Sequence, residues 1–465
     1  MLCLKPLSLC EEFISQINVT LKQAFNKNLT LSQRVWLSIC ITGILITNSV
    51  CWKRIERATL GHYRAGTLSK MFRRTKIDWD SLLKASILHI LNTYNISYGV
   101  LALDDTANQR SKKTSRISQV HKVKDKKTGG YFNGQEVVFL LLITEKLTIP
   151  VGFAFYEPQP DISLWRKENV RLKKQGVAKN NRPKQPSIDI NNYPSKQILA
   201  RDLLHQFSAN FPQIKIQCVL ADALYGTKNF IKSAAALLKT QIISQIKCNQ
   251  MVKSQGKYIR VDDYFKRNPG VAKQLVIRGD QQKSVMIHGA RLVLKAHGCK
   301  RFIIALKYDG EEQYRYLVAS ELTWRLTDIA TAYTMRWLVE VFILDWKSYE
   351  GWCQLAKQQG ADGSSQGLIL SLLTDHCLLL HPEQKALINR KLPALTVGSL
   401  RDLECMKSII ESIESLVKSE ESKSIVHELS RKIAEVIPLR SSAKHMSGRN
   451  LGRLEPTTSL KYRTA

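Results

Sequence analysis

The sequence lacks the cysteine spacing of a metal-binding module. Its ten cysteines are scattered from Cys3 to Cys405, and no two of them form a C-x2-C pair. A structural zinc site therefore has no support. A chain of 465 residues does not need disulfides to hold its fold, so we expect reduced thiols in a cytoplasm.

Long hydrophobic runs are also scarce. Glu11 and Glu12 interrupt the apolar start, so we expect no signal peptide. The stretch from Val35 to Trp52 has about the minimum length of a membrane span, but serine, threonine, asparagine and glycine dilute it. We therefore expect a buried pair of helices here and no membrane partner.

Acidic residues are few compared with basic ones. The chain has 39 Asp and Glu against 70 Lys and Arg, which gives a formal net charge of +31. This excess attracts polyanions, of which nucleic acid is the commonest. The 44% of hydrophobic residues excludes a disordered chain, and the length allows two to four folding units.

The first 95 residues predict helices with almost no strand signal. One helix starts at Leu31-Ser32, Thr42-Gly43 offers a break, and a later helix carries Lys53, Arg54 and Arg57. Short helices around a glycine turn, the last one basic, fit a helix-turn-helix that binds the major groove of DNA. A plain helical bundle that happens to be basic fits equally well.

From residue 98 onward the pattern is rich in strands. Three strands, a helix, a strand, a helix and a strand are predicted at 98–103, 136–144, 147–155, 198–207, 214–220, 228–238 and 241–246. This is the order of a ribonuclease H-like fold, in which the first and fourth strands lie side by side. The strand ends that carry Asp105 and Asp222 are then close together. Two basic segments, Arg110–Lys127 and Trp165–Lys184, are predicted as loops that contact phosphates, with a solvated loop as the alternative.

These patterns predict an α/β chain, α+β overall, with five parts. A helical DNA-binding region spans 1–95, and a ribonuclease H-like core spans 96–247 and 318–380. A β-rich insertion at 248–317 interrupts the core, and a helical C-terminal region with a basic tail occupies 381–465. We expect the last part to mediate dimerisation.

One segment after the insertion has polar residues at a helical spacing. Tyr333, Arg336, Glu340 and Lys347 lie three, four and seven residues apart, close to whole turns of one helix. A carboxylate between two cations and a phenol suits a site where a metal-binding acid lies beside a phosphate backbone. The alternative is an ordinary surface pair of Arg336 and Glu340.

Three acids form the candidate catalytic set: Asp105, Asp222 and Glu340. Converging carboxylates bind hard cations, and two Mg²⁺ or Mn²⁺ ions can activate an attacking oxygen and stabilise a leaving one in phosphoryl transfer. Each acid has a structural alternative, since Asp104 and Asp105 can cap the next segment and Asp222 can begin a turn.

The chain resembles bacterial insertion-sequence transposases of the DDE class, in the group with the signature Y-x2-R-x3-E-x6-K. Tyr333, Arg336, Glu340 and Lys347 match all four places. Residues 103–106, Leu-Asp-Asp-Thr, are similar to the segment of the first acid, where the catalytic Asp directly precedes Thr; this favours Asp105 over Asp104. Residues 221–226 are similar to the segment of the second acid.

The resemblance implies a metal-dependent, cut-and-paste DNA transposase. Its partners would be terminal inverted repeats and target DNA, bound by a homodimer in the bacterial cytoplasm, at the nucleoid. Relatives stack a Trp of the insertion on a flipped base, and Tyr316 stands at that place here, with a core aromatic as the alternative. Two other functions stay open: a DNA-binding protein that has lost catalysis, and a stand-alone nuclease of the same fold.

Overall fold

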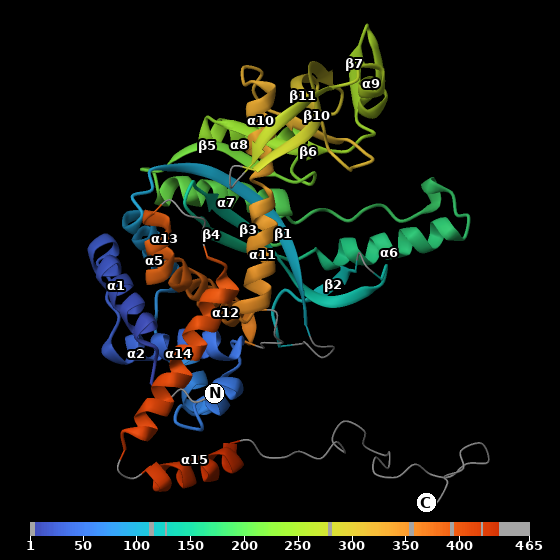
Figure 1. Cartoon of the computed structure of the whole chain (residues 1–465). Helices are drawn as coiled ribbons and strands as arrows, with labels where there is room; N and C mark the ends of the chain where they lie inside the picture. Colours follow the sequence, from blue (N-terminus) through green and yellow to red (C-terminus); the bar gives the residue numbers. More distant parts are fainter. Residues whose placement is uncertain are drawn as a thin grey trace, which may run out of the picture.

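The computed structural model describes residues 5–110, 116–125, 128–277, 281–352, 358–390, 395–419 and 422–436. It shows a mixed α/β protein in which a long mixed sheet runs between helices (Figure 1). The strands are β1 (Tyr98–Gln109), β2 (His121–Lys124), β3 (Tyr131–Ile143), β4 (Thr148–Tyr156), β5 (Lys215–Ala221), β6 (Gln241–Ile246), β7 (Met251–Ser254), β8 (Lys257–Arg260), β9 (Val271–Ile277), β10 (Gln281–Leu294), β11 (Cys299–Tyr308) and β12 (Arg315–Ala319).

The strands described form a 12-stranded sheet in the order β2-β3-β1-β5-β6-β12-β11-β10-β7-β8, with β4 on β3 and β9 on β10. In its first half, β1 pairs antiparallel with β3 and parallel with β5, and β5 pairs parallel with β6. The predicted contact between the first strand and the strand at 214–220 is therefore confirmed. The order β4-β3-β1-β5-β6 is consistent with a ribonuclease H-like core.

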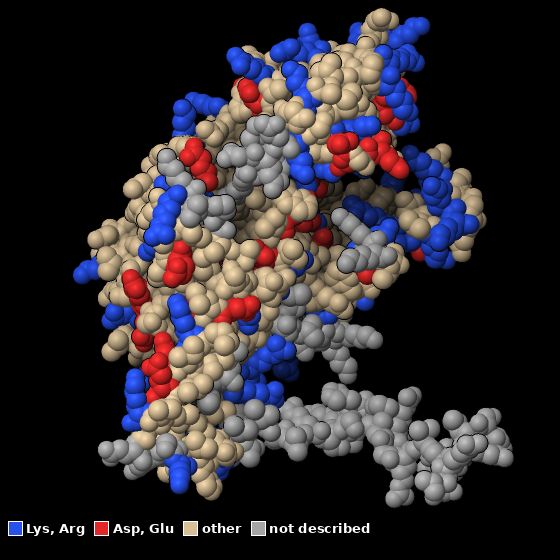
Figure 2. All heavy atoms as spheres, in the orientation of Figure 1, with Lys and Arg blue, Asp and Glu red and all other residues tan. Residues whose placement is uncertain are grey.

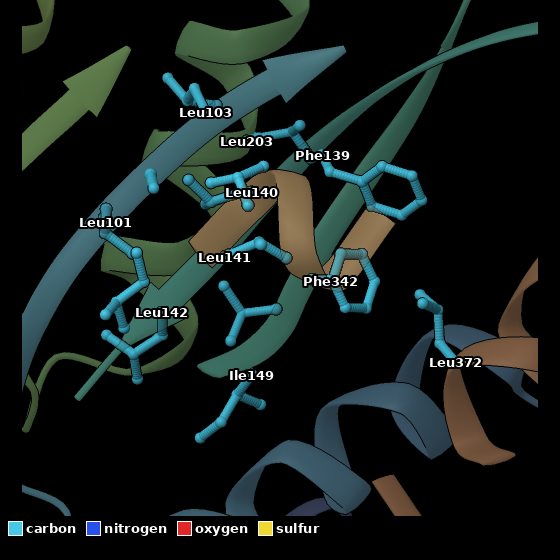
Figure 3. Close-up of a cluster of buried hydrophobic side chains, with 14 of the residues drawn as sticks. Leu101, Leu103, Phe139, Leu140, Leu141, Leu142, Ile149, Leu203, Phe342 and Leu372 are labelled. Carbon is cyan, nitrogen blue, oxygen red and sulfur yellow. The ribbon is translucent and has the colours of Figure 1, made fainter. Parts of the chain in front are cut away.

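The core of this half lies on both faces of β1 and β3 (Figure 3). Both strands carry continuous apolar runs, as expected of strands that are buried on two sides. Phe139 packs edge-on against Phe342 and Trp346 on one face, whereas Leu140 lies on the other face with Leu203. The side chains of successive residues alternate between the faces, and this alternation also places the acids of β1.

The strands of the predicted insertion continue the same sheet. Strand β12 pairs antiparallel with β6, and β11 and β10 follow. Strand β10 is the longest of them and pairs with β11 from Val285 to Leu294. A short helix, α9 (Val261–Arg267), precedes β9.

The N-terminal region is helical, as predicted, with α1 (Ser8–Phe25), α2 (Leu31–Thr47), α3 (Trp52–Ala58), α4 (Ala65–Arg74) and α5 (Trp79–Thr93). Helix α2 begins with a capping box between Thr30 and Gln33. It continues through Thr42 and Gly43, so the predicted break at this pair is wrong. The helix ends at Thr47, and the next residue, Asn48, caps it in a left-handed conformation.

Gly43 serves the packing of α2 against α3. A Cβ at this position would lie 2.7 Å from two side-chain carbons of Ile55, which is fully buried. We expect Gly43→Ala to lower the free energy of unfolding by about 1–3 kcal/mol, because overpacking outweighs the better helix propensity of alanine. Gly66→Ala in α4 is the control, since a Cβ there meets no atom within 4 Å. Equal denaturation midpoints for the two variants would contradict this account.

The two basic segments predicted as loops differ in what they form. In the first, residues 121–124 are strand β2, while residues 111–115, 126 and 127 lie outside the described residues. The second contains a helix, α6 (Pro160–Lys174), which has only one buried residue, Ile162, and so leaves no apolar stripe in the sequence. The prediction of a loop is therefore wrong for residues 165–174, which belong to α6.

The chain after α6 returns along the helix. Trp165 donates a hydrogen bond to the carbonyl of Pro183 (2.7 Å), which ties the returning chain to the helix. We name residues 160–187 the α6 arm, which extends to the right of the sheet in Figure 1. The chain then enters α7 (Lys196–Asn210), and α8 (Lys228–Leu238) follows β5.

The last part described is helical: α10 (Leu326–Thr334), α11 (Trp337–Tyr349), α12 (Gly360–Leu379), α13 (Pro382–Asn389), α14 (Val397–Val417) and α15 (Ser422–Val436). The predicted basic tail lies outside the described residues. In the part of the chain described, no single helix has the length and hydropathy to cross a membrane. Helices α2 and α3 pass that test only as a pair bent by 82°, and residues 36–46 of α2 are buried in the protein.

Candidate active site

The predicted single helix at 333–347 is two helices. Tyr333 lies in the last turn of α10, and Arg336 is the residue before α11. Between them the backbone N–H groups of Met335 and Arg336 donate to carbonyls three residues earlier, as in a 3₁₀ turn. Periodicity alone does not reveal this interruption, because the dihedral angles of Met335 and Arg336 stay helical.

Arg336 joins two carboxylates from distant parts of the chain. Its Nη1 lies 2.9 Å from Oδ2 of Asp104 on β1, and its Nη2 lies 2.5 Å from Oε1 of Glu340, one turn further along α11. The Arg336 and Asp104 side chains are only 16% and 15% exposed, whereas Glu340 is 42% exposed. The predicted alternative, an ordinary surface pair of Arg336 and Glu340, is therefore incomplete, because Arg336 also binds Asp104 and so anchors α11 to the sheet.

The two aspartates of β1 lie on opposite faces of the sheet. Asp104 is in register with Phe139, whose ring packs on α11, and Asp105 is in register with Val138. Asp105 accordingly binds a residue of α7: Nζ of Lys196 lies 2.6 Å from its Oδ2. Pairing between β1 and β5 ends at Leu103 and Ala221, and Asp104 and Asp222 come directly after it. Strand β1 itself continues to Gln109 in its pairing with β3, so the predicted strand end at residue 103 is wrong and both aspartates of β1 lie inside the strand.

Asp105 belongs to a chain of ion pairs on the α7 face. Lys196 also lies 2.7 Å from Glu136 of β3, and the other oxygen of Glu136 accepts from His121 of β2 (2.9 Å). Burial disfavours the charged amine, but the Asp105 and Glu136 carboxylates outweigh it and hold the pKa of Lys196 above its usual range. Lys196 therefore stays cationic and balances two carboxylates.

Asp222 combines a structural and a candidate catalytic position. Its Oδ1 accepts the N–H of Leu224 (2.9 Å), and its carbonyl accepts the hydroxyl of Ser244 (2.6 Å). The predicted turn at Asp222 is present, and the turn fixes the carboxylate at the end of β5.

The pKa of Asp104 is shifted by its surroundings. Burial raises it to about 6, the positive charge of Arg336 lowers it, and the negative charges of Asp222 and Asp105 raise it.

The other two residues of the predicted stripe also contact the sheet. Nζ of Lys347 donates to Oγ1 of Thr106 (2.6 Å) and to the carbonyl of Ala107 (2.9 Å). The hydroxyl of Tyr333 lies 3.5 Å from the side-chain oxygen of Gln245 on β6. Lys347 and Tyr333 thus reach the same part of the sheet as Arg336, although the helix is interrupted between α10 and α11.

The carboxylates match Mg²⁺ or Mn²⁺ in kind, since both ions prefer oxygen donors. Among the residues described, however, no three His, Cys, Asp or Glu side chains are grouped closely enough to hold a metal ion. Arg336 lies between Asp104 and Glu340, and Lys196 lies on Asp105. The positive charges of Arg336 and Lys196 thus balance these carboxylates, as the charge of a bound metal ion would.

A large cleft opens beside α11. Its volume is about 1730 Å³, and its lining includes Arg336, Glu340, Lys283 and Arg315. The cleft extends from the start of β10 and the end of β11 to the start of α14. The lining also includes Glu145, Asp309, Asp345 and Asp375, so the walls of the cleft carry charges of both signs.

Four predicted DNA contacts lie elsewhere. Tyr316 is 6% exposed in β12 and packs against Phe265, with ring centroids 5.9 Å apart. Burial raises its pKa to about 12. The structure places it as a core aromatic, with no ring face open to a base. Lys53 and Arg54 are exposed on α3, where Lys53 pairs with Glu56, and Arg57 is half-buried.

Sequence patterns missed Lys196 and Glu136 as neighbours of the candidate site. Both residues occur in segments whose polar side chains have no distinctive spacing. The alternation of faces along β1 and β3 could have grouped Glu136 with Asp105, had the register of the two strands been known.

Two comparisons with known proteins bear on this site. A family model described as DDE superfamily endonuclease matches residues 24–276, which include the strands of Asp104, Asp105 and Asp222 but not α11. No curated protein matches the chain.

Proposed function

The chain belongs to the DDE superfamily endonucleases, and on this premise we propose that it is a DNA transposase. It would cleave phosphodiesters at the ends of its own element and join the exposed 3′ ends to target DNA. The single observation that carries the proposal is the pair of contacts that Arg336 makes with Asp104 and Glu340, because they fix α11 against β1 at the point where its pairing with β5 ends.

The acids of β1, β5 and α11 would hold divalent ions. Asp222, Glu340 and one aspartate of β1 are the ligands we propose; Asp105 is favoured by its place before Thr106, and Asp104 by its contact with Arg336. Bound there, the ions would activate the attacking oxygen and stabilise the leaving one. The residues of the chain then mainly supply position and positive charge.

Arg336 and Lys347 have different tasks in this proposal. The Arg336 guanidinium presents its donors as a planar fork that suits a phosphate as well as a carboxylate, so it can exchange Asp104 or Glu340 for the DNA backbone. Lys347 is held by β1 through Thr106 and Ala107, and it therefore fixes α11 to the strand. The cleft beside α11 would receive the DNA.

The α6 arm would hold DNA outside the cleft. Figure 2 shows Lys and Arg side chains gathered on the arm, where Figure 1 draws α6. Because each lysine that binds a phosphate releases a counterion, removal of one such lysine lowers the slope of log K against log salt by about 0.9. We expect Lys173→Ala with Lys174→Ala to reduce this slope by up to about 2, measured by fluorescence anisotropy over a salt series.

The control for the arm is a second pair of exposed lysines. Lys232→Ala with Lys239→Ala, in α8 and directly after it, removes the same charge from another part of the surface. This variant should keep the wild-type salt slope. An unchanged slope in the arm variant would exclude the arm from DNA binding.

The proposed function is tested with the ends of the protein's own element. Incubation with a duplex that spans the boundary, a target plasmid and Mg²⁺ should give breaks at the boundary and joined products. Breaks without joined products would favour the stand-alone nuclease. Specific binding without breaks, in Mg²⁺ and in Mn²⁺, would favour a DNA-binding protein that has lost catalysis.

A further inference from the structure

The ammonium group of Lys196 lies between two carboxylates. Its Nζ is 2.6 Å from Oδ2 of Asp105 and 2.7 Å from Oε1 of Glu136. The three side chains are only 14%, 19% and 17% exposed, so water and salt screen their charges weakly. The ammonium group compensates one of the two carboxylates, whereas a divalent cation would compensate both. These three charged groups therefore form a place where a divalent cation and the lysine compete.

The first turn of α7 sets the position of Lys196. Lys196 is the first residue of this helix, and the next residue, Gln197, donates a hydrogen bond to the carbonyl of Leu224 (2.7 Å). The N–H of Leu224 in turn binds Oδ1 of Asp222 (2.9 Å). Two consecutive residues at the start of α7 thus reach Asp105 of β1 and the turn that holds the acid of β5. The fold places Lys196 at the same end of the sheet as both aspartates.

The lysine side chain can change partners while α7 stays in place. Its ammonium group carries three donors at the end of a flexible four-carbon stem. A third neighbour, the ring of Tyr156, has its centroid 5.1 Å from Nζ, which is within the range of a cation–π contact. The contacts with Tyr156 and Glu136 do not involve Asp105. Lys196 can therefore release Asp105 and still be held beside the site.

We propose that Lys196 occupies the place of a divalent cation at Asp105, and that it releases Asp105 and binds a phosphate of the DNA when the ion is bound. An ammonium group and a divalent ion repel each other when both contact one carboxylate. Lys196 therefore turns away from Asp105, and Glu136 keeps it within reach of the DNA backbone beside the ion. The inference rests on the proposed function, and it makes Asp105, not Asp104, the ligand from β1.

The first test measures metal binding by the full chain without DNA. Titration with Mn²⁺, followed by the electron paramagnetic resonance of the free ion, gives the dissociation constant. We expect Lys196→Gln to lower this constant at least about tenfold, because the amide can still donate hydrogen bonds but has no charge that competes with the ion. Lys196→Met, which is also neutral, should lower it in the same direction. Lys196→Arg keeps the charge and should bind Mn²⁺ as the wild type does, as should Lys232→Gln, the control at an exposed position in α8.

The gain in metal affinity should depend on Asp105. Lys196→Gln combined with Asp105→Asn should bind Mn²⁺ no more tightly than Asp105→Asn alone, because the lysine then has no ligand for which to compete. Equal dissociation constants for the wild type and Lys196→Gln would overturn the inference and leave the proposed function intact, as would a gain that persists in the Asp105→Asn background. If neither the wild type nor Lys196→Gln bound Mn²⁺ at a saturable site, the proposed metal chemistry would fail together with the inference.

The second test concerns the phosphate. Single-turnover cleavage of an element end is measured at saturating Mg²⁺, so that metal affinity does not limit the rate. We expect Lys196→Gln to cut about 100-fold more slowly than the wild type, because it lacks a cation beside the reacting phosphate, and Lys196→Arg to stay close to the wild type. A lysine with a purely structural role does not explain a variant that binds the ion more tightly and cuts more slowly. Cleavage by Lys196→Gln at the wild-type rate would overturn the contact with the phosphate.

Discussion

Asp222→Asn is expected to abolish DNA cleavage, with a loss of about 1000-fold or more. The amide keeps the size of the carboxylate but loses its charge, so it binds a divalent ion poorly. Stabilisation of several kcal/mol in the transition state is then lost, and each 1.36 kcal/mol corresponds to about tenfold in rate. Glu340→Gln should have an effect of the same order. Single-turnover cleavage of a labelled element end in Mg²⁺ measures both.

The fold should survive these changes. Oδ1 of Asp222 accepts the N–H of Leu224, and the asparagine oxygen can accept it too. DNA binding by gel shift should therefore remain close to that of the wild type. Asp202→Asn in α7, an exposed acid paired with Arg201, is the control and should cut normally. If Asp222→Asn cut DNA at the wild-type rate, the assignment of the acids would be wrong.

The second large effect concerns two buried acids beneath the site. Glu350 follows α11 and Asp375 lies in α12; Glu350 is fully buried and Asp375 is 3% exposed. Burial raises the pKa of Glu350 well above its usual value and raises the pKa of Asp375 to about 7. Each carboxyl group therefore binds its proton more tightly in the folded state than in the unfolded state. For Asp375, the contribution to stability is largest below the pKa of the unfolded chain, about 4, and is lost as the pH rises through about 7.

Asp375→Asn should remove the part of this loss that Asp375 causes, because an amide needs no proton to remain neutral. At about pH 8 we expect the variant to be more stable than the wild type by about 2–4 kcal/mol, and at about pH 4 to be nearly equal to it. Urea denaturation at both pH values gives the comparison. Asp362→Asn, at an exposed position in the first turn of α12, should follow the wild-type curve. Parallel curves for Asp375→Asn and the wild type would show that these acids are ionised in the folded protein.

Much of the fold could be predicted from the sequence because its strands are long and apolar. The run from Tyr98 to Leu103 and the run from residue 136 to 144 predicted β1 and β3, and their order predicted the parallel contact of β1 with β5. Helix α6 could not be predicted, since it buries a single residue and has no apolar period. The break between α10 and α11 was missed because a 3₁₀ turn keeps the helical spacing of the side chains nearly intact.

The residues of the candidate site could be predicted from the sequence better than their arrangement in space. The spacing of Tyr333, Arg336, Glu340 and Lys347 predicted side chains with a common direction, and three of them contact the sheet. Whether Asp104 or Asp105 lies on the face of α11 depends on the register of β1 with β3, which local sequence does not contain. The two aspartates have different partners, Arg336 and Lys196, for that reason alone.

The proposed chemistry requires acids from β1, β5 and α11 to converge on one cation site, and iron-directed cleavage of the protein tests this directly. Fe²⁺ placed in the site, with ascorbate and peroxide, cuts the backbone only near the bound ion. We expect cuts in three segments, around Asp104-Asp105, Asp222 and Glu340, that excess Mg²⁺ suppresses. Cuts that fall in only one of these segments, or that Mg²⁺ does not suppress, would contradict a shared site.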